Sequence, residues 1–180
     1  MDTGTVKMAP MRAAAHHRGS FDFVGLHPLA GSEGHGWDAA SANLFAGRQI
    51  VYCTASPGRF AASARELIVL LGAVPLKMDA KIHDQFGAAA IGLPHILAFA
   101  ARGYASKSKK ANLLRGSSWE SLARVAASDP AMVAGFLSAN ASEQIKALKQ
   151  FQRHLDRITK LLTHPDEKRL EQVLRSMAGT

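Results

Sequence analysis

Residues 23–33 hold a histidine where a protein could use it for acid–base chemistry. The segment FVGLHPLAGSE runs an apolar strand into His27, a proline and a glycine turn. Ligands of open α/β sheets bind at strand ends, and an unperturbed imidazole titrates at about pH 6.5. His27 could therefore take and return a proton at neutral pH. The alternative for a histidine beside a proline is a packed, hydrogen-bonded structural role.

Three further side chains could contribute to a binding site. Arg124 carries a planar guanidinium that matches a carboxylate with two parallel hydrogen bonds, although an interhelical salt bridge is its alternative role. His83 and His95 are twelve residues apart in an apolar helical segment, which separates them by ~120° around a straight helix. A bend caused by Pro94 could bring them to one side. Both could equally be core histidines, and with no cysteine or glutamate at ligand spacing we expect no metal.

The elements that must position these side chains divide the chain into two parts. Apolar runs predict strands at 21–26, 49–54 and 74–78, with a helix at 59–71. This order is typical of the end of a nucleotide-binding α/β sheet. Helical spacing dominates later, and it predicts helices at 80–102 and 119–127, a further start at Asp129-Pro130, and two more after Asn140 and Pro165.

We therefore predict an α+β to mainly α fold. A remnant of a Rossmann-type α/β sheet occupies residues 1–79, and an all-α helical dimerisation unit occupies residues 80–180. Asn140 and Glu143 form a capping pair that begins the longest helix after 140. That helix has apolar residues at alternating spacings of three and four, as in a helix packed against a partner: Leu148, Phe151, Leu155, Ile158 and Leu162. We expect this surface to form a homodimer.

Composition excludes several classes of protein. The 180 residues are 47% hydrophobic, enough for a core, but no apolar run reaches the ~18 residues of a membrane span, and no secretory signal is visible. Cys53 is the only cysteine, which fits a reducing cytoplasm. The net charge of +8 is spread along the chain, apart from a cluster at 107–110 that is either solvated or an anion-binding patch. We expect no membrane and no nucleic-acid partner.

Four motifs resemble those of the prephenate/arogenate dehydrogenase family of tyrosine biosynthesis. They are DTGTVK at 2–7, similar to the family's D-x-G-S-x-K; HPLAGSE at 27–33; GLPH at 92–95; and WESLARVA at 119–126. The last differs from the family's F-x-D-x-T-R-I-A at Trp119, Ser121 and Ala123. The resemblance extends from Asp2 to about residue 140, with a compatible helical tail beyond.

The resemblance implies oxidative decarboxylation of prephenate or arogenate, with a hydride passing to NAD or NADP. It implies that His27 accepts the proton of the ring hydroxyl and that Thr5 orients this hydroxyl. It assigns Thr5 and Lys7 to the cofactor, and it assigns the substrate to Arg124, His95, His83 and Glu33. Helix N-capping is the alternative for Thr5, and a surface carboxylate is the alternative for Glu33.

The sequence has no G-x-G-x-x-G fingerprint, the motif through which dinucleotides bind to such sheets. We therefore expect a truncated dehydrogenase whose cofactor site is incomplete in this chain, so that the chain alone binds NAD(P) poorly. The alternative is a non-catalytic helical dimerisation or regulatory module derived from the same family. Prephenate against arogenate, NAD against NADP, and inhibition by tyrosine stay open.

Overall fold

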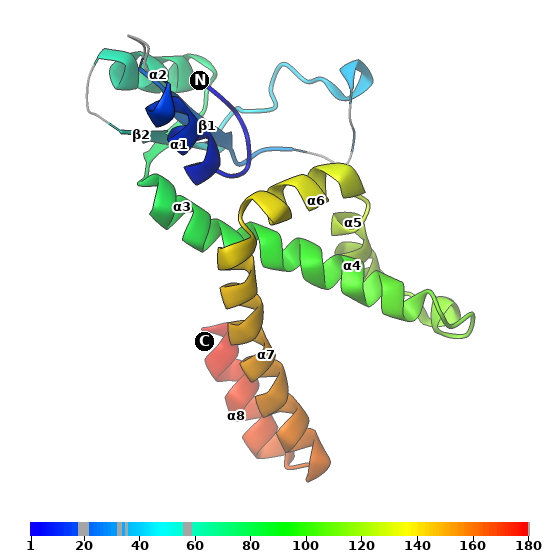
Figure 1. The fold of residues 1–180 in the computed structure, drawn as a ribbon. Coiled ribbons are helices and arrows are strands. Elements are labelled where there is room, and N and C mark those ends of the chain that lie inside the picture. The colour runs from blue at the N-terminus through cyan, green and yellow to red at the C-terminus, as the bar shows by residue number, and fades with distance from the viewer. Residues whose placement is uncertain (18–21, 32–33, 35, 56–58, 180) are drawn as a thin grey trace.

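A computed structural model describes residues 1–17, 22–31, 34, 36–55 and 59–179. Figure 1 shows a small sheet unit at one end and a long helical hairpin extending from the other. The sheet unit contains α1 (Met8–His16), β1 (Val24–Pro28), η1 (Trp37–Ala39), β2 (Gln49–Thr54), α2 (Arg59–Leu70) and β3 (Val74–Lys77). The predicted strands and the helix between them are confirmed, and β2 has the predicted bounds.

The three strands lie in the order β1-β2-β3, with β1 antiparallel and β3 parallel to β2. Asp2 adds a parallel bridge to Gly25 at the free edge of β1. Side chains on β2 alternate between two buried faces, because helices cover both sides of the sheet. Ile50 and Tyr52 pack with α2, whereas Val51 and Cys53 pack toward α1 and the start of the helical unit.

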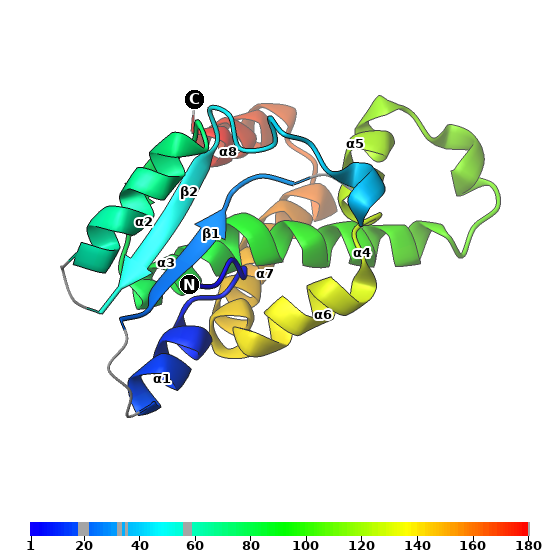
Figure 2. The same ribbon diagram turned by 90° about the horizontal axis from the view of Figure 1, so that it is seen from above.

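The helical unit is built on one long, interrupted helix. It comprises α3 (Ala80–Gly87), a π turn η2 (Ala88–Gly92) and α4 (Leu93–Ala105). The π turn lies directly before Leu93 and Pro94, where the sequence suggested a bend. The remaining elements are η3 (Ala111–Leu114), α5 (Ser117–Val125), α6 (Pro130–Ala139), α7 (Ala141–Thr163) and α8 (Glu167–Ala178). Seen from above, α4 runs beneath the end of β1, with α5 and α6 beside it (Figure 2).

Local signals place the helix ends as expected, with one exception. Asp129 caps α6 by accepting from the amide of Ala131, and Pro130 opens the first turn. The capping role predicted for Asn140 is wrong, because its side chain makes no cap bond. Its Nδ2 instead donates to the carbonyl of Asp84, 2.7 Å away in α3. Asn140 therefore ties α7 to the first helix of the unit.

The helix from Ala80 to Ala105 is long and apolar enough to cross a membrane by length and composition alone. Only 17% of its most apolar window is buried within the chain. A single helix of this kind is weak evidence for a membrane span, and here the helix contacts α1, α5 and α7. The described residues therefore leave most of the apolar surface of this helix uncovered.

Candidate functional site

His27 lies near the end of β1, where its buried ring meets a residue of the helical unit. Its Nδ1 is 2.9 Å from Nε2 of His83 in α3, and the two rings meet edge to face. Nδ1 of His83 is in turn 2.8 Å from Oδ1 of Asp84. The three side chains form a hydrogen-bonded chain from the helical unit to the sheet.

The positions of the protons on His27 and His83 follow from the carboxylate of Asp84. Its ionised carboxylate only accepts hydrogen bonds, so Nδ1 of His83 donates to it. Nε2 of a neutral His83 then accepts, and Nδ1 of His27 donates. This assignment leaves Nε2 of His27 with its lone pair as the acceptor.

The surroundings keep His27 neutral. Burial lowers its pKa from 6.5 to about 4, His83 and Lys7 push it in the same direction, and Asp84 and Asp2 oppose them. Burial alone would raise the pKa of Asp84, but hydrogen bonds from the His83 ring and from two backbone amides lower it. At neutral pH the site therefore pairs an ionised carboxylate with an uncharged imidazole that can accept a proton.

Asp84 also caps the N-terminus of helix α1, although that helix lies 76 residues earlier in the sequence. The amides of Lys7 and Met8 donate to its two oxygens, each at 2.8 Å. These are amides at the start of a helix that has no side-chain cap of its own. The alternative role of Thr5 as a helix N-cap is therefore wrong, and a carboxylate from another element provides the cap.

Lys7 is fully buried, which contradicts its predicted contact with a cofactor. Its Nζ donates to Oδ2 of Asp2 at 2.8 Å and to the carbonyl of Leu26. Its stem passes Gly25, where an added Cβ would lie only 3.1 Å from Cδ of Lys7. Lys7 therefore fixes the first residues of the chain against β1, because a buried ammonium must be paired.

A cavity of about 650 Å³ lies between the sheet unit and the helical unit. His27, Thr5 and Thr3 line it from the sheet side, and His95 and Arg124 line it from the helical side. The predicted convergence of His27 and Arg124 on one cavity is thus present. Its apolar wall contains Leu29, Leu44, Phe45, Ile91, Val125 and Met132.

The other predicted site residues differ in position. His95 faces the cavity, and its Nδ1 donates to the carbonyl of Ile91 at 2.8 Å while its ring meets Phe136 edge to face. His83 does not line the cavity, because its ring is buried behind His27. His83 therefore holds the His27 ring in place and does not make the predicted contact with the substrate. Glu33 lies outside the described residues.

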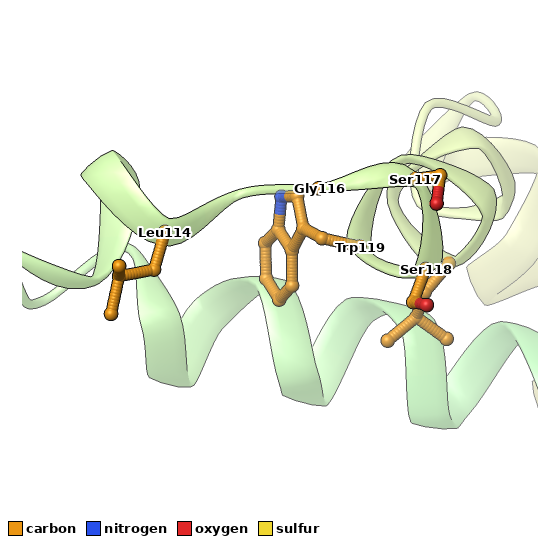
Figure 3. A pocket seen from close by; sticks show the side chains of 6 residues that line it. Leu114, Gly116, Ser117, Ser118 and Trp119 are labelled. Carbon is orange, nitrogen blue, oxygen red and sulfur yellow. The ribbon is translucent and has the colours of Figure 1, made fainter.

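A second hollow lies at the start of α5 and holds none of the predicted site residues. Figure 3 shows the Trp119 ring between Leu114 and the serines that begin this helix. The guanidinium carbon of Arg115 is 5.3 Å from the ring centre. None of the residues lining this hollow is titratable, so the cavity at His27 is the better candidate site.

Sequence reasoning missed Asp84, Asp2 and Asn140 as parts of the site. Asp84 directly follows His83, and that adjacency was the signal available. Asp2 and its partner Lys7 both belong to the DTGTVK motif, but that motif did not predict their ion pair. Asn140 carried only the signal of a helix start, because its partner Asp84 lies far away in the sequence. Within the described ranges no three His, Cys, Asp or Glu side chains gather as a metal site would require.

The structure thus defines a two-part protein in which a sheet unit and a helical unit enclose a cavity lined by His27 and Arg124. The chain belongs to the prephenate dehydrogenase family: the family's nucleotide-binding domain matches residues 1–74, and its dimerization domain matches residues 79–176.

Individual relatives of known family support this assignment. A prephenate dehydrogenase of Lactococcus lactis subsp. cremoris is 31% identical over 83% of this chain and 42% of its own length. A cyclohexadienyl dehydrogenase of Zymomonas mobilis is 28% identical over 92% of this chain and 59% of its own length. The chain therefore spans about half the length of these curated relatives.

Solved structures share the fold. An arogenate dehydrogenase of Synechocystis superimposes with a TM-score of 0.83 at 25% identity, over 99% of this chain and 66% of that one. A prephenate dehydrogenase of A. aeolicus, solved with hydroxyphenyl propionate and NAD+, gives a TM-score of 0.87 at 24% identity, over 98% and 64%.

The substitution Asp84→Asn should destabilise the protein by about 2–3 kcal/mol, measured by urea unfolding. An amide offers one acceptor oxygen in place of two, so a buried donor of Lys7, Met8 or His83 loses its partner. Asp79→Asn is the matched control, because Asp79 caps α3 at the surface and asparagine caps equally well. Equal stability of the two variants would contradict the role given to Asp84.

The neutral state of His27 predicts how stability depends on pH. The unfolded chain binds a proton at His27 below pH 6.5, whereas the folded chain binds it only below about pH 4. Stability should therefore fall by about 3 kcal/mol as pH drops through this window, with no contribution above it. His27→Gln should remove this dependence and the exposed control His154→Gln should keep it; an unchanged slope in His27→Gln would refute the assignment.

Proposed function

We propose that this chain is the substrate-binding and proton-accepting part of a prephenate or arogenate dehydrogenase. The observation that carries the proposal is that His27, His95 and Arg124, from β1, α4 and α5, line one cavity. Membership of the prephenate dehydrogenase family supports the same reaction. A cavity of about 650 Å³ is within the range of small-molecule sites.

In the proposed reaction His27 accepts the proton of the ring hydroxyl. A hydride leaves the carbon that bears this hydroxyl easily only if the oxygen loses its proton. Nε2 of His27 is the free acceptor in the assigned tautomer, and the ring is neutral at physiological pH because its pKa is about 4. Carbon dioxide then leaves as the ring becomes aromatic, so the protein mainly orients and deprotonates the substrate.

The substrate's carboxylates and ring have separate partners in the cavity. We assign the side-chain carboxylate to Arg124, whose guanidinium can bind it with two hydrogen bonds. The product of prephenate, 4-hydroxyphenylpyruvate, keeps this carboxylate, whereas the ring carboxylate leaves as carbon dioxide. The aromatic Phe45 and the apolar Ile91 and Met132 suit a six-membered ring. His95 offers Nε2 as a further polar contact, because its Nδ1 is held by the Ile91 carbonyl.

A nicotinamide cofactor, when bound, would supply the hydride acceptor. The residues described here fit one end of it: Thr3 and Thr5 border the cavity beside His27 and could contact the nicotinamide ring. The buried Lys7 cannot contact it, and the sequence offers no glycine-rich turn for the phosphates. We therefore propose weak NAD(P) binding by the chain alone and leave the choice between NAD and NADP open.

We also propose that the chain acts as a homodimer through its helical unit. The match to the family's dimerization domain supports this, as does the poorly covered apolar helix from Ala80 to Ala105. Ile82 and Phe86 are exposed on one face of α3. We further propose a cytoplasmic location, with which the buried thiol of Cys53 is compatible, because burial raises its pKa to about 11.

The substitution Arg124→Lys should weaken binding of 4-hydroxyphenylpyruvate about tenfold or more, measured by titration calorimetry, because an ammonium cannot bind a carboxylate with two parallel bonds. Arg153→Lys on the exposed side of α7 is the matched control and should bind as the parent chain does. His27→Gln should bind within about threefold of the parent.

Two outcomes would contradict the proposal. Equal affinity of Arg124→Lys and the parent chain would mean that Arg124 does not bind the carboxylate of the ligand. Rapid rise of nicotinamide absorbance with prephenate and NAD, using this chain alone, would contradict the proposed weak binding of NAD(P), although it would support the proposed reaction.

Sedimentation equilibrium should give twice the chain mass of 19.2 kDa at micromolar concentration. Phe86→Glu should shift the equilibrium toward the monomer, because it places a charge on the apolar face. Lys168→Glu at the exposed start of α8 is the charge-changing control and should leave the dimer intact. A parent chain that sediments as a monomer would contradict dimerisation.

A further inference from the structure

The π turn between α3 and α4 changes which residues share a face of the long helix. In this turn the amide of Leu93 donates to the carbonyl of Ala88, five residues earlier, where an α-helix would bond four residues earlier. A single π turn takes up one extra residue without rotating the helix that follows. Residues on either side of η2 are therefore related as if the segment were one residue shorter.

This shift aligns the two histidines of the helix. Twelve residues of straight α-helix separate His83 and His95 by about 120°, whereas eleven residues separate them by about 20°. The observed contacts agree with the smaller angle. His83 touches the Nδ1 side of His27, and His95 lines the cavity that His27 also lines. Both rings thus lie on the side of the helix that meets β1.

The π turn ends in a close contact with α7. Gly92, the last residue of η2, lies against the buried side chain of Gln144, and a Cβ added to Gly92 would lie 2.2 Å from both Nε2 and Oε1. No larger residue can take this position without displacing Gln144. A regular α-helix would turn the neighbouring Ile91 or Leu93 toward α7, and their side chains would not fit there.

The same turn holds the His95 ring. Ile91, which accepts the hydrogen bond from Nδ1 of His95, belongs to η2. Oε1 of Gln144 is buried without a hydrogen-bond partner among the described residues. A buried amide oxygen without a partner is unfavourable for folding, so its retention against Gly92 calls for a compensating role.

We propose that Gly92 and Gln144 are positioning residues: their contact locks the π turn in the register that places His95 on the same face as His83, with both toward His27. This inference rests on the proposed function for its effect on ligand binding, but its effect on the His95 ring is independent of that function. The chemical class of ligand is the aromatic acid proposed above.

The first test is a pair of substitutions with a matched control. Gly92→Ala should weaken binding of 4-hydroxyphenylpyruvate about tenfold or more, because the new Cβ displaces Gln144 and turns His95 away. Gly87→Ala is the control in the same helix, since a Cβ there meets nothing within 4 Å. The double variant Gly92→Ala/Gln144→Ala should bind better than Gly92→Ala, because the shorter side chain makes room for the new Cβ. It should still bind about threefold more weakly than the parent, because the contact that holds the turn is gone.

A second readout on the same variants separates positioning from general damage. Long-range nitrogen–proton NMR of labelled histidine should show the Nδ1–H form of His95 in the parent chain and the double variant, and its loss in Gly92→Ala. Parent-like binding and an unchanged His95 signal in Gly92→Ala would overturn the inference, as would a double variant no better than the single one. If the parent chain binds no probe, the proposed function fails while the NMR result still decides this inference.

A length change tests the register directly and serves if Gly92→Ala does not fold. Deletion of Ala90 should keep affinity within about threefold, because an α-helix of eleven residues gives the same angle between the histidines. Insertion of one alanine after Ala90 should weaken binding about tenfold or more, because it rotates His95 by about 100°. The opposite ranking of these two variants would overturn the inference.

Discussion

The carboxylate of Asp84 is the group on which the site depends. It accepts one hydrogen bond from the His83 ring and two from the amides that begin α1. One buried charge thus joins the first residues of the chain, the helical unit and, through His83, the histidine on β1. Because an ionised carboxylate in a buried place needs these donors, the three elements are held in one arrangement.

The cavity follows from that arrangement. With β1 and α3 fixed to each other, His27 faces α4 and α5, which bring His95 and Arg124 to the opposite wall. His95 lies on the same face of the long helix as His83 because the π turn absorbs one residue between them. Asn140, directly before α7, and Gln144, one turn later, both contact the α3–η2 segment. The geometry of the site is therefore set by contacts between units that are distant in sequence.

The sequence predicted what local pattern determines. The apolar run of β2, the cap at Asp129 and the imidazole at the end of β1 all follow from neighbouring residues, and the structure has them where expected. Helix α1 could not be predicted, because its cap comes from Asp84. The burial of Lys7 depends on Asp2 and the Leu26 carbonyl, and the π turn depends on Gln144. A spacing rule for straight helices could not foresee that His83 would support His27 from behind.

The most direct measurement of the central claim is the protonation state of His27 by nitrogen NMR of histidine-labelled protein at about pH 6. The account predicts a neutral ring with its proton on Nδ1, hydrogen-bonded to His83, and an unprotonated Nε2. Asp84→Asn should disturb this signal, and Asp79→Asn should not. A protonated His27, or a ring that carries its proton on Nε2, would contradict the account.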